Sequence, residues 1–293
     1  RPIPALTGLR FFAALQIIVY HEKADHIHNA PRLIDNFLDA GHVAVGLFFV
    51  LSGFILVYNY APGPDKRTSS TRDFLVARFA RIYPIYLLGL ALALPRFCQV
   101  VASEFPLGQS VARISSVVGA SLLLVQSWFP SMAYEINGPG WSLSAEAFFY
   151  VAFPPILLLL ISERARKHWL SLAIVLWAVS LCIVTFVYSW APGQPMLAHV
   201  HRPTVWLILV YAPLFRWPEF IIGMILGAAF LQNDVQWSGS ARKFARAGVI
   251  AVTALIVLLA FSPYLPDVPL HPSLLTPLFG AIIVCLAVGN GLI

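Results

Sequence analysis

Long, uninterrupted apolar runs constrain this chain more than any other feature of its sequence. Ser171–Ser189 and Val249–Phe261 contain no charged residue. In hydrocarbon no water can bond the backbone, so only α-helices and closed β-barrels satisfy every peptide group there. Barrel strands alternate apolar and polar residues, whereas these runs are continuously apolar. The pattern therefore predicts an all-α protein, a polytopic bundle of transmembrane helices.

Composition supports this prediction. The chain has 293 residues, of which 59% are hydrophobic and 11% are charged, while soluble domains carry about 25% charged residues. Lipid is thus an expected partner. The net charge of +6 fits basic cytoplasmic loops better than nucleic acid, and no nucleic-acid partner is expected. The three cysteines, Cys98, Cys182 and Cys285, have no metal-ligand spacing, so no metal is expected.

Eight apolar segments are candidates to cross a membrane, which takes roughly 20 residues. They are Leu6–His21, Ala40–Tyr60, Phe74–Leu94, Ser142–Ile161, Trp169–Ser189, Val205–Leu231, Val249–Phe261 and Leu274–Gly289. A ninth run, Ser115–Trp128, has 14 residues. That length is more typical of a re-entrant or interfacial segment.

The basic residues indicate whether the ninth run spans. If it does not, and the N-terminus is cytoplasmic, thirteen Lys and Arg lie inside, five lie outside, and Arg216 lies within a helix. The inside set is Arg1, Arg10, Lys66, Arg67, Arg72, Arg78, Arg81, Arg164, Arg166, Lys167, Arg242, Lys243 and Arg246; the outside set is Lys23, Arg32, Arg96, Arg113 and Arg202. If the run spans, the basic loops at 164–167 and 242–246 move outside. The positive-inside rule therefore favours a re-entrant segment, with Glu22–Asp39 outside.

Ionisable residues within apolar segments are costly and indicate functional sites by default. Arg10 and His21 are eleven residues apart, close to three helical turns, so both face one side of the first helix about 16 Å apart. His21 is suited to accept a proton near neutral pH. Alternatively, Arg10 extends to the cytoplasmic interface and His21 simply ends the helix. The spacing favours neither interpretation.

Arg78 and Arg81 form a second cluster. At spacing i,i+3 their side chains point the same way, and two guanidiniums on one face can bind phosphate through bidentate hydrogen bonds. Ordinary positive-inside anchoring is the alternative, and without other information it is favoured.

A third cluster follows Gly138-Pro139-Gly140, residues that are expected to interrupt a helix. Ser142 and Glu146 are neighbours at i,i+4. Ser142 could simply cap the helix. Glu146 lies one turn into an apolar helix, where a carboxylate must pair or be protonated. Its candidate partners are Arg10, His21 and Arg216.

The fourth cluster lies inside Val205–Leu231. Arg216 and Glu219 are at i,i+3 and could simply neutralise each other within one helix. Pro218 between them is expected to kink the segment. Gly223 and Gly227 follow in the GxxxG spacing that is typical of a helix-packing face.

Taken together, these residues resemble the membrane-bound acyltransferase family 3. Five motifs carry the resemblance, in order: Leu6–Phe11 with His21 eleven residues after Arg10; Phe48–Phe54; Arg78-Phe79-Ala80-Arg81 with Pro84; Trp141–Glu146; and Pro213–Gly223, containing Arg216, Glu219 and Phe220. The matching stretch covers Leu6–Gly227.

The resemblance implies an enzyme of about ten helices in the bacterial inner (plasma) membrane. Such a protein is an O-acyltransferase, which moves an acyl group, usually acetyl from acetyl-CoA or another acyl-CoA, to a hydroxyl of a surface polysaccharide, a lipid or a secreted small molecule. His21 carries over as the catalytic residue and Arg10 as its motif partner. Arg78 and Arg81 match the pair associated with the donor. The resemblance leaves open the roles of Glu146, Arg216 and Glu219; Glu146 is the next candidate base.

One departure concerns the C-terminal end. Family members continue into two further helices with a serine–tyrosine, leucine–tyrosine and histidine signature that nothing here matches. We therefore expect one domain over residues 1–293 that lacks its last two helices.

Several alternatives stay open. His21 could act as general base or be acylated first, and Arg10, Arg216 or Ser142 could stabilise the oxyanion. A transporter of an anionic metabolite or lipid is the competing function. Transporters often have broken helices in both halves of a repeat, whereas this chain has one such break, at Gly138–Gly140.

Overall fold

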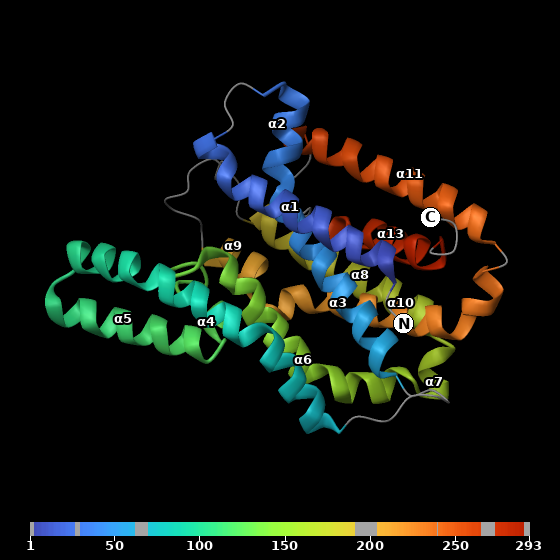
Figure 1. Ribbon diagram of the computed structural model, residues 1–293, viewed down its shortest axis with the longest axis horizontal. Helices are drawn as coiled ribbons and strands as arrows, with labels where there is room; N and C mark the ends of the chain where they lie inside the picture. Colours follow the sequence, from blue (N-terminus) through green and yellow to red (C-terminus); the bar gives the residue numbers. More distant parts are fainter. Residues whose placement is uncertain are drawn as a thin grey trace. The chain divides into compact units, whose positions relative to one another are not determined.

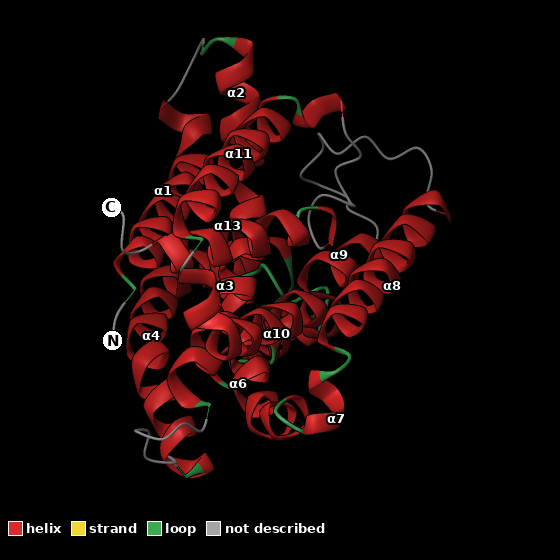
Figure 2. Ribbon diagram, turned by 90° about the vertical axis from the view of Figure 1, so that its right-hand side faces the viewer, coloured by secondary structure: helices red, strands yellow, loops and turns green. Residues whose placement is uncertain are grey.

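The computed structural model of the protein describes residues 3–26, 30–61, 70–190, 204–238, 240–264 and 273–289, which form helices joined by loops and turns and contain no strand (Figures 1 and 2). The prediction of an all-α fold is confirmed. The α-helices are α1 (Pro4–His26), α2 (Arg32–Asp39), α3 (Ala44–Tyr60), α4 (Thr71–Glu104), α5 (Leu107–Leu122), α6 (Trp141–Leu160), α7 (Glu163–Arg166), α8 (Trp169–Trp190), α9 (Thr204–Tyr211), α10 (Pro213–Ser238), α11 (Ala241–Ala260) and α13 (Thr276–Val288).

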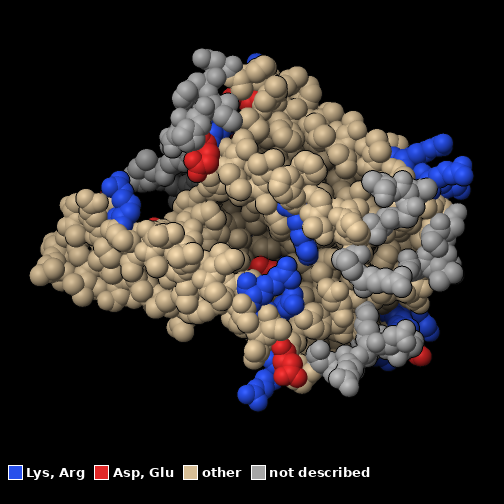
Figure 3. Space-filling view, viewed as in Figure 1, with Lys and Arg blue, Asp and Glu red and all other residues tan. Residues whose placement is uncertain are grey.

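Six helical stretches in the described part of the chain are long and apolar enough to cross a membrane. They are Arg32–Tyr60, Thr71–Glu104, Gly138–Leu160, Trp169–Val187, Trp206–Asn233 and Ala241–Ala260. The other two predicted segments correspond to α1, which is interrupted by polar residues, and to α13, which has 13 residues. Figure 3 shows the consequence on one face, where charged side chains occupy a few places and uncharged residues cover the rest. The chain is a multi-pass membrane protein.

The assignment of loops to the cytoplasmic or the outer side of the membrane stays a prediction. Four of the residues in the charge count, Arg1, Lys66, Arg67 and Arg202, lie outside the described residues. The boundaries of two predicted loops differ from the structure. Helix α10 continues to Ser238, beyond Leu231, where the predicted segment ends, and α1 and α2 occupy most of the predicted outer stretch Glu22–Asp39. In both places the structure has additional helical turns at the ends of apolar segments. These turns contain polar residues, so a hydropathy pattern does not detect them.

The chain forms two compact units. The first contains residues 1–61, 159–196 and 218–293, and the second contains residues 62–158 and 197–217. They are called unit 1 and unit 2.

Glycines bring the backbones of α3 and α10 together in unit 1. A Cβ atom at Gly223 would overlap the carbonyl oxygen of Val50, and one at Gly53 would overlap that of Phe220. At Gly227 it would lie 2.7 Å from the carbonyl oxygen of Phe54. The prediction that Gly223 and Gly227 form a packing face is therefore confirmed.

The remaining core of unit 1 is built around α13. Its residues Phe279, Ile282 and Ile283 are buried, and the helix packs against α11 and α3. Helix α13 is apolar on all sides, and a helix of this composition is expected to be buried. Other helices of the unit cover it, as expected.

Helix α4 organises unit 2. Ser70 caps its first turn, accepting a hydrogen bond from the backbone N–H of Asp73 at 3.1 Å, and 34 residues then run on to Glu104. Helix α5 lies antiparallel along its C-terminal half, and near the middle of α4 Tyr86 donates a hydrogen bond to the carbonyl oxygen of Ser121. Helix α6 lies antiparallel along the N-terminal half, where Phe74 stacks on Phe153 with centroids 5.0 Å apart.

The ninth apolar run divides between the end of α5 and a turn. Leu124 has a positive φ of 56°, and its carbonyl oxygen accepts a hydrogen bond from Ser144. Gln126 donates to the carbonyl oxygen of Gly140, and Ser127 to that of Trp141. The run is therefore fastened to the start of α6. Helix α5, at 16 residues or about 24 Å, is not among the six candidate spans.

The segment predicted as Val205–Leu231 is two helices. Helix α9 ends at Tyr211, and α10 begins at Pro213 and runs through Pro218. The break falls at Ala212 because a residue before proline disfavours the helical conformation. Pro213 is tolerated at the first position of α10, where its missing N–H is not needed.

Candidate active site

Helix α1 carries Arg10 and His21 on one unbroken helix of 23 residues, as predicted. The Nδ1 atom of His21 lies 2.8 Å from the carbonyl oxygen of Ile17. A carbonyl oxygen can only accept a hydrogen bond, so in the neutral ring this geometry assigns the hydrogen to Nδ1. Nε2 is then the nitrogen that can take up a proton, as a general base requires.

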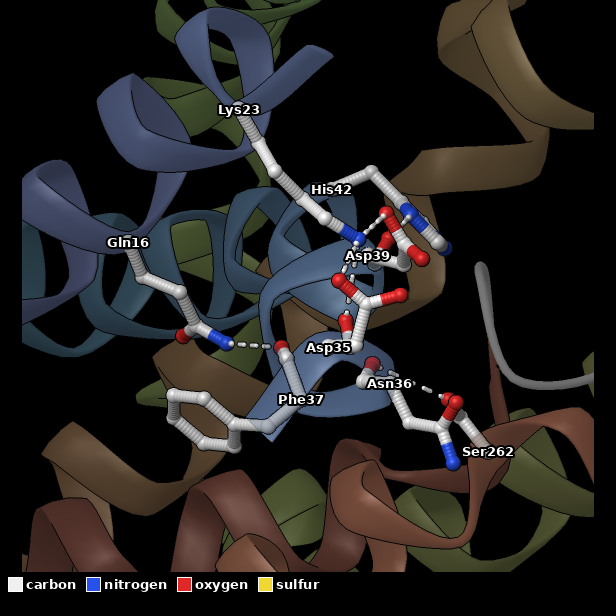
Figure 4. A network of polar contacts seen from close by, with 8 residues as sticks. All are labelled: Gln16, Lys23, Asp35, Asn36, Phe37, Asp39, His42 and Ser262. Atoms are coloured by element: carbon white, nitrogen blue, oxygen red, sulfur yellow. Dashed lines mark hydrogen bonds and ion pairs between the residues drawn. The ribbon is translucent and has the colours of Figure 1, made fainter. Parts of the chain in front are cut away.

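A buried lysine fastens the end of α1, two residues beyond His21 (Figure 4). The Nζ atom of Lys23 lies 2.7 Å from a carboxylate oxygen of Asp35 and 2.7 Å from one of Asp39. It also donates a hydrogen bond to the backbone carbonyl of Asp35. The side chain of Lys23 is 11% exposed. This cluster, the Lys23 clamp, joins the last turns of α1 to α2.

Further contacts hold the same end of α1. Gly41 packs against Tyr20, because a Cβ atom at that glycine would lie 2.5 Å from the Tyr20 Cβ atom. The Tyr20 ring makes edge contacts with His21 and His42, with centroids 5.0 and 5.4 Å apart. Helix α2 is bonded on its other side, where Asn36 donates to the carbonyl oxygen of Ala260. His21 therefore lies on a helix end held from several directions.

In unit 2, the predicted donor pair meets the predicted carboxylate. Arg78 and Arg81 lie in the first turns of α4, and Glu146 lies on α6. The Tyr150 hydroxyl donates a 2.5 Å hydrogen bond to Glu146 and interacts electrostatically with both guanidiniums. The α4–α6 pairing thus assembles two cations, a carboxylate and a phenol in one place, called the Arg78–Glu146 cluster below.

Sequence reasoning missed Tyr150. The tyrosine, one turn later on the same helix, donates a hydrogen bond to Glu146, and the candidate partners Arg10, His21 and Arg216 stay predictions. The i,i+4 spacing of Glu146 and Tyr150 could have predicted this contact from the sequence. Sequence reasoning also missed Lys23, Asp35 and Asp39, because they fell in a stretch interpreted as an outer loop.

Ser142 has a structural contact. Its hydroxyl donates a 2.9 Å hydrogen bond to the carbonyl oxygen of Pro139, which secures the turn before α6. The neighbouring Ser144 is fully buried and donates to the carbonyl oxygen of Leu124. Ser142 thus secures the turn before α6, and Ser144 joins the ninth run to α6.

Arg216 and Glu219 are each 1% exposed, among the most buried charged residues in the described part of the chain. The guanidinium carbon of Arg216 lies 5.8 Å from the centroid of the Trp141 ring, within cation–π range. Trp141 also packs against Tyr211, with centroids 5.0 Å apart. Arg216 belongs to unit 2 with these aromatic residues, and Glu219 belongs to unit 1.

These features define a class: a multi-pass helical membrane protein that concentrates its ionisable side chains at a few places on apolar helices. The family with the description "Acyltransferase domain" matches residues 3–293. The chain belongs to this family, as its motifs indicated.

Relatives agree with this assignment. The chain is 31% identical to Acyltransferase MdmB of Streptomyces mycarofaciens over 81% of its own length and 59% of that protein. It is 30% identical to YrhL of Bacillus subtilis, whose name attributes to it peptidoglycan O-acetyltransferase activity, over 66% of its length and 29% of YrhL. It is 26% identical to a Staphylococcus aureus (strain COL) protein named for O-acetyltransferase activity, over 75% of its length and 36% of that protein.

The chain thus spans between 29% and 59% of the length of these relatives. No solved structure matches it.

Proposed function

We propose that this chain is the membrane domain of an O-acyltransferase that moves an acyl group, normally acetyl, from acyl-CoA to a hydroxyl group. The observation that carries the proposal is the family match over residues 3–293, together with relatives named for acyl or acetyl transfer.

The Arg78–Glu146 cluster is the proposed donor site. Phosphate groups of coenzyme A would bind Arg78 and Arg81, whose planar guanidiniums bond phosphate oxygens in pairs. The adjacent carboxylate of Glu146 offsets part of the positive charge. Its hydrogen bond from Tyr150 satisfies one of its oxygens.

His21 is the proposed catalytic residue. Its Nε2 atom accepts the proton of the acceptor hydroxyl as that oxygen attacks the thioester carbonyl carbon. The new C–O bond forms, the C–S bond breaks, and the departing thiolate takes up a proton. In the alternative route, His21 attacks first and carries the acyl group to the acceptor. The bond between Nδ1 and Ile17 supports both routes, because each needs Nε2 unprotonated.

The acceptor is proposed to be a hydroxyl of a surface glycan, a lipid or a secreted small molecule, and the membrane to be the bacterial plasma membrane. The peptidoglycan named for YrhL makes a glycan the first acceptor to test.

The test uses membrane vesicles that contain the full chain and acetyl-CoA labelled in the acetyl group. Covalent label should appear in the glycan fraction of vesicles with the chain and be absent from vesicles without it. A transporter would instead move labelled metabolite across the membrane without forming an ester. Uptake without covalent transfer would therefore overturn the proposal.

A further inference from the structure

A pocket of about 350 Å³ lies at the C-terminal end of α4, where α4 and α5 run side by side (Figure 1). Residues of α4, of α5 and of the segment before α6 line it. Its floor includes Phe97 and Val101, which are buried, and Arg96 and Glu104 lie exposed at its rim. The pocket belongs wholly to unit 2 and contains none of the residues assigned to the reaction above.

An ion pair fixes one wall of the pocket. Arg113 of α5 lies 2.8 Å from Glu135, through one guanidinium nitrogen and one carboxylate oxygen. The guanidinium also lies 5.3 Å from the centroid of the Phe105 ring. Both side chains are partly exposed, at 38% and 28%. They are therefore held in place and still able to bond a ligand.

The charges of the lining balance. Arg96 and Arg113 contribute two positive charges, and Glu104 and Glu135 contribute two negative charges. Such a lining attracts neither an anion nor a cation strongly. It offers guanidinium donors and carboxylate acceptors above an apolar floor, which suits a ligand with hydroxyl groups at its edges and C–H groups on its faces.

We propose that this pocket binds a segment of a neutral, polyhydroxylated acceptor, a glycan chain. The inference rests on the proposed function and specifies the acceptor class. Arg81 and Arg96 are fifteen residues apart on α4, or about 22 Å along the helix axis. Donor phosphates and this part of the acceptor thus bind at opposite ends of one helix. By the predicted topology, the pocket end lies outside the cytoplasm.

The first experiment measures binding without a donor. The full chain in nanodiscs is titrated with chitotetraose, a neutral tetrasaccharide, and saturation-transfer NMR detects contact with its protons. The fully de-N-acetylated tetramer, a cation, and tetragalacturonate, an anion, serve as charged counterparts. Chitotetraose should bind at least about tenfold more tightly than either. Equal or tighter binding of a charged tetramer would contradict the proposed lining.

Variants locate the binding. Arg96→Gln removes a rim donor and leaves the Arg113–Glu135 pair intact, whereas Glu135→Gln weakens the fixed wall. Each should weaken chitotetraose binding about tenfold, the loss expected for a charged hydrogen bond. Arg72→Gln, at the other end of α4, is the matched control and should bind as the parent does. Parental binding by both pocket variants would overturn the proposal.

The outcome is independent of acyl transfer, since no donor is present. If vesicles transfer acetyl groups but both pocket variants keep the parental KM for the glycan, the proposed function stands and the pocket assignment fails. A lipid headgroup is the competing occupant of the pocket. It is tested by adding phosphatidylethanolamine to phosphatidylglycerol nanodiscs and measuring whether this lipid displaces the saccharide. If it does, and the pocket variants abolish the displacement without changing the affinity for the saccharide, the pocket is a lipid site and the proposal is wrong.

Discussion

At the scale of single residues, His21 and Glu146 each have neighbouring polar residues that the sequence pattern did not single out. His21 lies beside the Lys23 clamp, and Glu146 is bonded by Tyr150. Arg10, His21, Arg78, Arg81 and Glu146 could be predicted because a charge in an apolar run is conspicuous. Lys23, Asp35 and Asp39 could not, since charges in a polar stretch are ordinary and only tertiary packing brings these three together.

The Lys23 clamp predicts a measurable contribution to stability. Lys23→Met removes both ion pairs, and we expect it to lower the free energy of unfolding by about 1–2 kcal/mol, because the lysine is buried while both carboxylates are partly exposed. Chemical denaturation in detergent measures this. Lys243→Met, at an exposed position of α11, is the control. A Lys23→Met variant as stable as the control would show that the clamp contributes nothing.

The clamp also has a predicted pH dependence. Burial lowers the pKa of Lys23, but the hydrogen bonds and charges of Asp35 and Asp39 outweigh it, so the pKa is raised above 10.5. A raised lysine pKa gives stability that is fully present below the unfolded value and is lost as pH rises through the folded value. The difference between parent and Lys23→Met should therefore be constant from neutral pH to about 9 and shrink above 10.5. A difference that persists unchanged well above pH 10.5 would contradict this account.

Arg78 gives a test of the donor site. Arg78→Lys keeps the charge but loses the planar fork, so the variant should bind coenzyme A about tenfold more weakly. Isothermal titration of purified protein measures the affinity. Arg72→Lys, two turns earlier on α4, should behave as the parent. If a well-folded Arg78→Lys protein keeps parental affinity, Arg78 is an interfacial anchor and not a phosphate ligand.

At the scale of elements, hydropathy located the apolar helices well and their ends poorly. Each of the eight predicted segments is helical over most of its length, because a long apolar run in lipid has little alternative. The ends depend on local chemistry instead. Ser70 starts α4, Pro213 starts α10, and α2 is held by bonds to α1 and α11. Such contacts leave no periodic signal.

The close approach of α3 and α10 predicts that Gly223 cannot be enlarged. Gly223→Ala places a methyl group against the Val50 carbonyl, where backbone must move, and we expect a loss of about 3 kcal/mol or more in the free energy of unfolding. Gly119→Ala on α5 meets nothing within 4 Å, so it should be neutral or slightly stabilising. Thermal unfolding of both variants decides the point; equal midpoints would refute the packing interpretation.

At the scale of the whole molecule, one family match covers residues 3–293 and therefore both compact units. Four of the five motifs fall within one unit each, with Arg10 and His21 in unit 1 and Arg78, Arg81 and Glu146 in unit 2, whereas the motif Pro213–Gly223 crosses the boundary between the units. The sequence could place the motifs in order. It could not show that the chain forms two units, since that follows from which helices pack together.

Topology gives the prediction at this scale. The basic residues Arg164 and Arg166 lie in the short helix α7, and Lys167 directly follows it. The positive-inside rule assigns this helix to the cytoplasm. In a variant without the native cysteines, Ala165→Cys should resist an impermeant thiol reagent in intact cells and react after lysis. Labelling in intact cells would reverse the topology and make Ser115–Trp128 a full span.

The most direct test of the account is the acyl-transfer rate of His21→Gln in the full chain, measured per folded molecule with acetyl-CoA and the glycan acceptor. Glutamine keeps a polar side chain but accepts no proton near neutral pH. The variant should therefore insert normally, bind coenzyme A as the parent does, and transfer about 10²–10⁴-fold more slowly. A rate within about threefold of the parent would remove His21 from the chemistry and make Glu146 the next candidate base.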